Sequence, residues 1–225
     1  MNARAHGIIG AFAALLMAGC ASVSETRFYT LSAPSGAPAA KDTERHSVEE
    51  GQGKHKPIFI EVLPVSVPER LARPQLVVRS QVSGQNTQLF ILEQDRWSSN
   101  FNYELRDAFA TGIANWTGAL NETRGIRSPD QPAYRIAIEL GQFDAIVGER
   151  VQARFNWTIT RSTDGRGTAC YSAISEPVDG GIQGLVKGIQ RVVSSVAADV
   201  SRSLVELDTG HATICAPRGN VIERY

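Results

Sequence analysis

The sequence predicts an α+β fold, in which an antiparallel-rich β-sheet carries two amphipathic helices packed on one of its faces. Two observations support this prediction. Several segments alternate apolar with polar residues, as strands with one buried face do, and two longer segments repeat apolar residues every three or four positions, as amphipathic helices do. No alternation of strands with helices is sustained long enough to predict a doubly wound parallel sheet.

The clearest strands are expected in the second half of the chain. Tyr134 to Leu140 and Val151 to Thr160 have a period of two, which places one face of each strand inward. A turn at Thr163 to Gly165 leads into a returning strand from Thr168 to Ser175. Earlier strands are expected at 27–31, 58–62, 75–79 and 88–92, and the last two form a hairpin.

Two helices are expected, one from Ser98 to about Leu120 and one from about Gly181 to Leu207. Ser98 is a suitable N-cap for the first helix, because its side-chain oxygen can accept a hydrogen bond from a backbone N–H of the first turn. The residues expected on the two buried faces are Phe101, Leu105, Ala108, Phe109, Ile113 (or Gly112) and Trp116 in the first helix, and Leu185, Ile189, Val192, Val193, Val196, Val200, Leu204 and Leu207 in the second.

The N-terminal residues are typical of a lipoprotein signal peptide that ends before Cys20. Arg4 supplies the charge of the leader, and the apolar stretch from Gly7 to Met17 is well short of the roughly 20 residues that cross a bilayer as a helix. Small residues, Ala18 and Gly19, precede the cysteine. Diacylglycerol on the Cys20 sulfur, with fatty acids such as palmitate, would hold the mature chain on the membrane. An ordinary secretion signal that happens to end in cysteine is the alternative.

The sequence divides the chain into three parts. Residues 1–19 are the expected signal peptide, 20–57 the lipidated N-terminus with a short strand and a flexible linker, and 58–225 a single α+β periplasmic domain. The linker is expected because the segment from Ala33 to Pro57 has Val48 as its one aliphatic residue besides alanine, and so buries too little apolar surface to offset its ordering entropy. Ala21 after the cysteine, where an aspartate would favour the inner membrane, is typical of an outer-membrane destination.

Charge and cysteine content narrow the classes of partner and environment. The 23 basic and 23 acidic residues leave no excess positive charge for a nucleic-acid partner. Two cysteines follow Cys20, namely Cys170 and Cys215, and in an oxidising periplasm the pair is expected to form a disulfide. Two buried free thiols are the alternative, because a bond requires the two backbones to be close.

The sequence offers no catalytic or metal-binding motif. His211 is the one histidine of the region expected to be structured, and there is no Gly-x-Ser-x-Gly, His-Glu-x-x-His or paired Cys-x-x-Cys pattern. We therefore expect no enzymatic activity, no cofactor and no bound metal.

Two short segments suggest a surface for a protein partner. Val67 to Arg79 combines two prolines and two arginines just before a strand, and Asp95 to Ser98 places a charge pair and a tryptophan where the first helix begins. Arginine and tryptophan are frequent in the energetic centres of interfaces. In the alternative interpretation, the second segment has a structural role, with Arg96 paired to Asp95 and Trp97 packed in the core. The candidate docking residues are Arg70, Arg73, Arg79, Arg96 and Trp97.

The same segments carry a family resemblance. Behind the Cys20 signal come Phe28 to Leu31, Leu71 to Arg79 and Asp95 to Ser98, and in this order they resemble the ABC-type transport auxiliary lipoprotein family. The resemblance continues through the later strands and the last helix. It implies an outer-membrane lipoprotein that faces the periplasm and works with MCE-domain proteins and an inner-membrane permease or ABC transporter to move lipids between membranes. The long segment after the first strand, 33–57, departs from the family pattern.

Three functions are compatible with these residues. The leading hypothesis is a non-enzymatic accessory subunit that docks a periplasm-spanning MCE protein. The second is a lipid-binding module that carries acyl chains between the helices and the sheet, and the third and weakest is an envelope hydrolase. Whether the chain forms a homo-oligomer is left open by the sequence.

Overall fold

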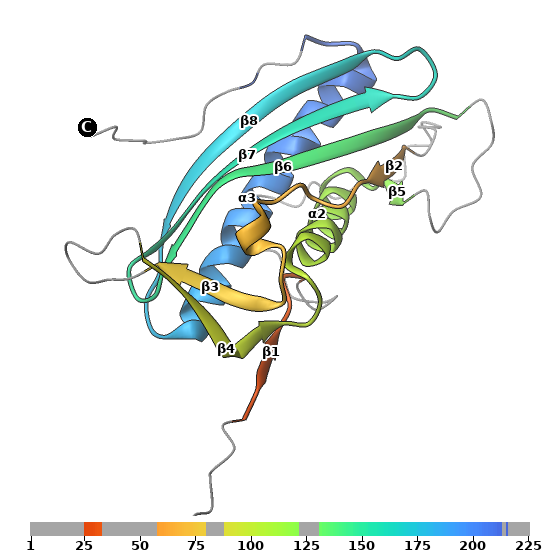
Figure 1. Ribbon diagram of the computed structural model, residues 1–225. Helices are drawn as coiled ribbons and strands as arrows, with labels where there is room; N and C mark the ends of the chain where they lie inside the picture. The colour runs from red at the N-terminus through yellow and green to blue at the C-terminus, as the bar shows by residue number, and fades with distance from the viewer. Residues whose placement is uncertain (1–24, 33–57, 80–87, 122–130, 213–214, 216–225) are drawn as a thin grey trace, which may run out of the picture.

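The computed structural model describes residues 25–32, 58–79, 88–121, 131–212 and 215. Within these residues two sheets and two α-helices form the fold, which confirms the predicted α+β class (Figure 1). Cys20, the expected signal peptide and the segment 33–57 lie outside the described residues. None of the described helices is long and apolar enough to cross a membrane.

The larger sheet forms the long axis of the molecule, with the strand order β5-β2-β6-β7-β8. Strands β6, β7 and β8 make an antiparallel meander, whereas β2 lies parallel to both of its neighbours. Buried residues alternate along β7, as the period-two pattern predicts. The bounds are β2 (Phe59–Val62), β5 (Leu120–Asn121), β6 (Ala133–Ile146), β7 (Arg150–Arg161) and β8 (Gly167–Pro177).

The smaller sheet lies at one end of the molecule and has the order β1-β4-β3 (Figure 1). It comprises β1 (Arg27–Tyr29), β3 (Gln75–Arg79) and β4 (Leu89–Trp97). The predicted hairpin between β3 and β4 is present, and β1 adds to the other side of β4 as a parallel strand. A short 3₁₀ helix, η2 (Glu69–Leu71), precedes β3 where the chain passes from the larger sheet to the smaller one.

Both predicted helices are present, with different starting residues. They are α2 (Phe101–Thr117) and α3 (Ile182–Thr209), and α3 covers one face of the larger sheet (Figure 1). The expected N-cap is wrong: Asn100 takes that position, and the Ser98 hydroxyl instead bonds the side chain of Glu104. The N-cap prediction fails because a buried carboxylate competes for the serine hydroxyl.

The core lies between the larger sheet and the two helices. Phe109 of α2 meets Phe155 of β7 edge to face, with ring centroids 5.4 Å apart. The two helices approach closely at Gly112, where a Cβ atom would lie only 2.8 Å from the Cβ of Ala197. Trp116, expected on the buried face of α2, is 65% exposed. It lies in the last turn, next to Thr117, where the helix ends.

Candidate functional site

The arginines predicted to dock a partner do not form one continuous group, and Arg70 is the most accessible of them. It is exposed on η2 and has no ion-pair partner among the described residues, while Leu71 beside it is buried in the core and fixes the turn. Arg73, two residues after η2, is half-buried, and its Nε has no hydrogen-bond partner in the described part of the chain. Pro68 and Pro74 flank these arginines and restrict the backbone on both sides.

Arg79 has a different environment, because it connects the two sheets. Its Nε donates to Asp144 Oδ1 over 2.7 Å, and its Nη2 contacts the same carboxylate, so the end of β3 is joined to β6. Both side chains are largely buried. The Arg79 guanidinium is therefore already paired with a carboxylate inside the molecule.

Arg96 and Trp97 are also engaged internally. The Arg96 Nε donates to the Glu93 carbonyl over 2.8 Å and its Nη2 lies 3.4 Å from the Glu93 carboxylate, so the expected local pairing with Asp95 is wrong. Trp97 is 3% exposed and stacks on Phe101 with ring centroids 5.2 Å apart. In this structure a partner cannot reach Trp97, and the core interpretation of this tryptophan holds.

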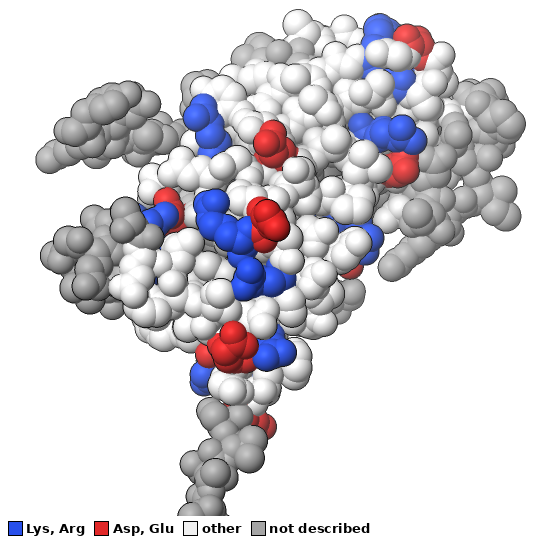
Figure 2. Space-filling model, in the orientation of Figure 1, with Lys and Arg blue, Asp and Glu red and all other residues white. Residues whose placement is uncertain are grey.

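The accessible part of the predicted surface is therefore the turn around η2. We use the name η2 surface for Glu69, Arg70, Ala72 and Arg73. Figure 2 shows basic side chains gathered over this region, with acidic ones between them. The η2 surface lies where the chain passes from the larger sheet to the smaller one (Figure 1).

Two buried carboxylates, Asp95 and Glu104, hold the first strand, a role that was not predicted for either residue. The first is Asp95 on β4, which accepts hydrogen bonds from Arg27 Nη2 at 3.0 Å and from the Tyr29 hydroxyl at 2.9 Å. Burial and the hydrogen bond to Asp95 raise the pKa of Tyr29. These two bonds explain why Asp95 is not available to Arg96.

The second carboxylate is Glu104 on α2, which is 5% exposed. Its Oε2 accepts from the Thr30 hydroxyl and the Leu31 N–H, both at 3.0 Å. Its Oε1 accepts from the hydroxyls of Ser98 and Ser99. Burial alone would raise the pKa of Glu104, but the four donors outweigh it and lower the pKa below its usual value.

A sequence signal for Glu104 existed: it falls three residues after Phe101 and four before Ala108, on the predicted apolar face of the helix. Because of these contacts, β1 and Leu31 belong to the packed body. The packed body therefore includes β1 and Leu31 as well as the elements that follow residue 58.

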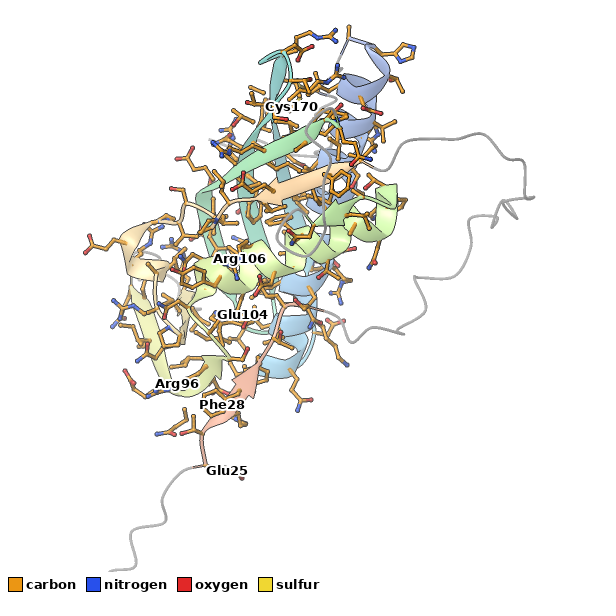
Figure 3. All side chains as sticks on the ribbon, turned by 90° about the vertical axis from the view of Figure 1, so that its right-hand side faces the viewer. Glu25, Phe28, Arg96, Glu104, Arg106 and Cys170 are labelled. Carbon is orange, nitrogen blue, oxygen red and sulfur yellow. A yellow bond between two sulfur atoms is a disulfide. The ribbon has the colours of Figure 1, made fainter. Side chains whose placement is uncertain are left out.

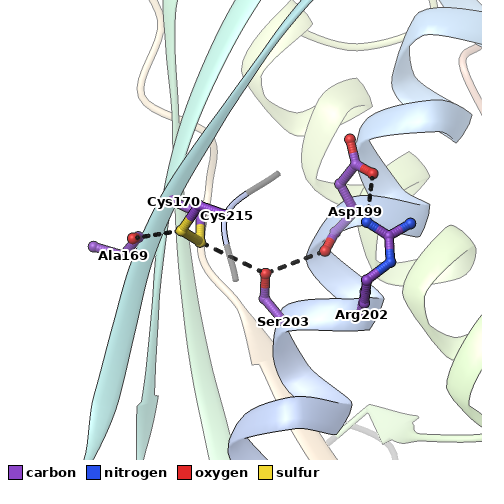
Figure 4. Close-up of a disulfide and its surroundings, with 6 residues drawn as sticks. All are labelled: Ala169, Cys170, Asp199, Arg202, Ser203 and Cys215. Carbon is purple, nitrogen blue, oxygen red and sulfur yellow. Dashed lines mark hydrogen bonds and ion pairs between the residues drawn. A yellow bond between two sulfur atoms is a disulfide. The ribbon is translucent and has the colours of Figure 1, made fainter. Parts of the chain in front are cut away.

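At the opposite end of the molecule, Cys170 and Cys215 are joined in a disulfide, with their Cα atoms 5.4 Å apart (Figure 4). The Ser203 hydroxyl on α3 lies 3.9 Å from Cys170 Sγ and 3.2 Å from the Asp199 carbonyl oxygen. The disulfide therefore holds Cys215 beside β8, close to α3.

The described residues form a small cavity and an open groove. A cavity of about 10 Å³ lies between the smaller sheet, α2 and α3, lined by Leu71, Trp97 and Leu185 among others, which is about the size of one water. An open groove of about 640 Å³ runs along α2 and α3 at Trp116, Arg191 and Arg202. No group of three or more histidine, cysteine or acidic residues suited to a metal is present in the described ranges.

Solved structures and a family model resemble the chain. One similar structure is that of an uncharacterized protein, with 17% identity and a TM-score of 0.53; the match covers 66% of this chain and 92% of the other. Another is that of a DUF330 protein from Xanthomonas campestris, with 15% identity and a TM-score of 0.53; the match covers 70% of this chain and 92% of the other. No curated protein matches the chain. The family model for the ABC-type transport auxiliary lipoprotein component matches residues 29–201, from β1 to α3. The chain therefore belongs to the ABC-type transport auxiliary lipoprotein family.

Proposed function

We propose that the protein is a non-enzymatic accessory subunit of an MCE/ABC-type system that transports lipids between membranes. In this proposal Cys20 is acylated and anchors the chain in the outer membrane, and the folded body faces the periplasm. There it docks the periplasm-spanning MCE component, which works with an inner-membrane permease or ABC transporter. The observation that carries the proposal is the family match over residues 29–201, a family of lipoproteins that assist ABC-type transport.

The η2 surface is the contact region we favour. Arg70 presents an accessible guanidinium on a turn that the buried Leu71 and two flanking prolines hold in place. A preorganised turn loses little entropy when a partner binds, and arginine is frequent at the centres of interfaces. Arg73, Arg79 and Arg96 stay candidate contacts through the parts of their side chains that remain accessible, whereas Trp97 would support the surface from below.

Capture of the partner tests this proposal. Tagged protein is crosslinked in cells and purified from solubilised envelopes, and the co-purified MCE protein is quantified. Arg70→Glu should reduce capture at least tenfold without changing the melting temperature, because Arg70 is exposed. Arg166→Glu is the matched control, since Arg166 is exposed in the turn between β7 and β8, away from the η2 surface. Failure of the wild-type chain to capture any MCE protein would overturn the proposal.

The lipid-carrier alternative receives no support from the described residues. It requires an enclosed apolar pocket, whereas the cavity between the smaller sheet, β6 and the helices has room for about one water and the groove of about 640 Å³ beside Trp116 is open. The hydrolase alternative needs a base beside a nucleophile in a cleft, whereas His211 is exposed after the end of α3, with its Nδ1 2.7 Å from the Thr209 hydroxyl.

A further inference from the structure

We propose that the smaller sheet is a membrane-contact surface, with Phe28 seated in the interfacial region of the phospholipid bilayer that holds the lipid anchor. This inference rests on the proposed acylation of Cys20 and adds an orientation to it. The occupant of the surface is a lipid bilayer, and the chemistry that would recognise it is an apolar side chain next to basic side chains.

The length of chain between the anchor and the body limits how far the body can move from the membrane. Cys20 lies five positions before Glu25, the first described residue. Fully extended, that stretch spans at most about 18 Å. The longer segment 33–57 adds nothing to this reach, because it follows β1 instead of preceding it.

Because the two buried carboxylates hold the first strand in place, the short tether also limits how the body can be oriented relative to the membrane. Asp95 holds Arg27 and Tyr29, and Glu104 holds Thr30 and Leu31, so the first strand cannot detach without breaking these four hydrogen bonds, of which the one from the Leu31 N–H is buried. A short tether ending on a fixed strand keeps that end of the body beside the membrane. Figure 3 shows Glu25, Phe28 and Arg96 at this end, and Cys170 at the other.

The face that β1 presents has the composition of an interfacial contact. Phe28 is 66% exposed and pairs in register with Arg96. Paired residues share a face, and the neighbouring pair, Tyr29 with Trp97, points to the opposite side, where Trp97 enters the core. Phe28 and Arg96 therefore project together, an aromatic ring beside a guanidinium that can reach lipid phosphates.

Exposed apolar residues also concentrate in this sheet. Leu89 and Ile91 pair with Arg79 and Val77 of β3, which alternate with the buried Leu76 and Val78, so both lie on the face of the hairpin opposite those buried residues. The register of the hairpin shifts between Gln75 and Leu76, before the pair of Gln75 with Arg96. Of the nine large apolar side chains exposed in the described part of the chain, four lie in the smaller sheet: Phe28, Leu89 and Ile91, and also Phe90, which pairs with the buried Val78 and so projects from the other face. Such a concentration in one small sheet indicates a contact surface.

Fluorescence quenching by the bilayer tests the orientation. Acylated full-length Phe28→Trp protein is reconstituted in vesicles of phosphatidylethanolamine and phosphatidylglycerol, with or without bromine on the acyl chains. We expect bromine to remove more than half of the fluorescence that the introduced tryptophan adds over the wild-type protein. Tyr171→Trp is the control, because Tyr171 is 42% exposed beside Cys170 at the far end, and its added fluorescence should be unchanged.

Two results would overturn the inference while leaving the proposed function intact: no quenching at position 28 in a chain whose acylation mass spectrometry confirms, or equal quenching at position 171. An unacylated Cys20 in chain purified from envelopes would instead contradict the anchor itself. A second variant of Phe28→Trp carries about 20 glycine and serine residues inserted before Glu25, so that the tether no longer enforces proximity. Quenching that persists supports a surface with its own affinity for lipid, and quenching that disappears overturns the contact surface.

Discussion

Glu104 on α2 accepts the backbone N–H of Leu31 at 3.0 Å, although 73 positions separate them in the chain. This bond joins the end of the first strand to the first helix. With the Asp95 contacts to Arg27 and Tyr29, it explains how a three-residue strand can be a stable part of the fold. The consequences can be tested by changing the carboxylates and the residues packed around them.

The first prediction concerns Glu104 and acid. Glu104→Gln should reduce the free energy of unfolding at pH 7 by about 1.5–3 kcal/mol, the usual range for hydrogen bonds to a charged group. Because the folded pKa is lowered, the stabilisation is present above the unfolded pKa, near 4.5, and is lost as the pH falls through the folded value. Urea unfolding at several pH values should therefore show the variant and the wild type converging below about pH 4.5. The exposed Glu93→Gln control should leave the difference between pH 7 and pH 4 as in the wild type.

The second prediction concerns Tyr134 and alkali. Its hydroxyl contacts Asp208 and accepts from Arg161 Nε at 3.0 Å, while Arg161 Nη2 donates to the Leu207 carbonyl at the end of α3. Burial, followed by the Asp208 contacts, raises the pKa of Tyr134 to about 12. Since the folded pKa is raised, stabilisation is complete below the unfolded value of 10.0 and is lost as the pH rises through about 12.

Tyr134→Phe should cost about 1–3 kcal/mol at neutral pH, because it leaves buried polar groups without a partner. Tyrosinate absorbance should lose a late-titrating component in this variant. The exposed Tyr103→Phe should not remove that component, and if it does, the assignment to Tyr134 is incorrect.

The third prediction concerns the contact between α3 and the end of β8. A Cβ atom on Gly188 would lie 2.1 Å from Val178 Cγ1, and the short valine side chain has little freedom to move away. Gly188→Ala should lower stability by about 1–3 kcal/mol, despite the better helix propensity of alanine. Gly181→Ala provides the comparison, because no atom lies within 4 Å of its added Cβ. Equal melting temperatures for the two variants would contradict the close packing.

The fourth prediction concerns the disulfide. Cys215→Ser opens a loop of 45 residues and should reduce stability by about 4 kcal/mol in the chain-entropy model. Differential scanning calorimetry should show the same decrease when the wild-type protein is reduced. A reduced wild type as stable as the oxidised protein would mean that the bond adds nothing to the folded state.

Much of this fold follows from local patterns. The alternation in Val151 to Thr160 predicted β7 because a period of two identifies the buried face whatever the neighbouring strands are. The same pattern cannot say which strands pair, so it did not separate the smaller sheet or place β1 beside β4. Pairing depends on contacts between distant segments, such as Tyr29 with Asp95.

The tryptophans show the corresponding limit for the candidate site. Trp97 was a candidate both for a partner surface and for the core and is buried, whereas Trp116 was expected in the core and is exposed. Residue type alone does not distinguish these cases, because a large aromatic ring suits both an interface and a core. Helical periodicity gives the direction of Trp116 but not how far the covering elements extend along α2.

On the proposed route, in which the chain is exported and acylated at Cys20, the bond from Gln190 to the Thr30 carbonyl, 2.9 Å long, has a consequence for the order of events. Its partners are 160 positions apart, so a chain delivered from its N-terminus has no α3 for the first strand to meet until nearly all of it has crossed the membrane. We expect the residues next to Cys20 to remain accessible to the acylating enzyme until α3 has crossed the membrane. Although β1 is the first strand to be synthesised, we expect it to be among the last elements to pack into the fold.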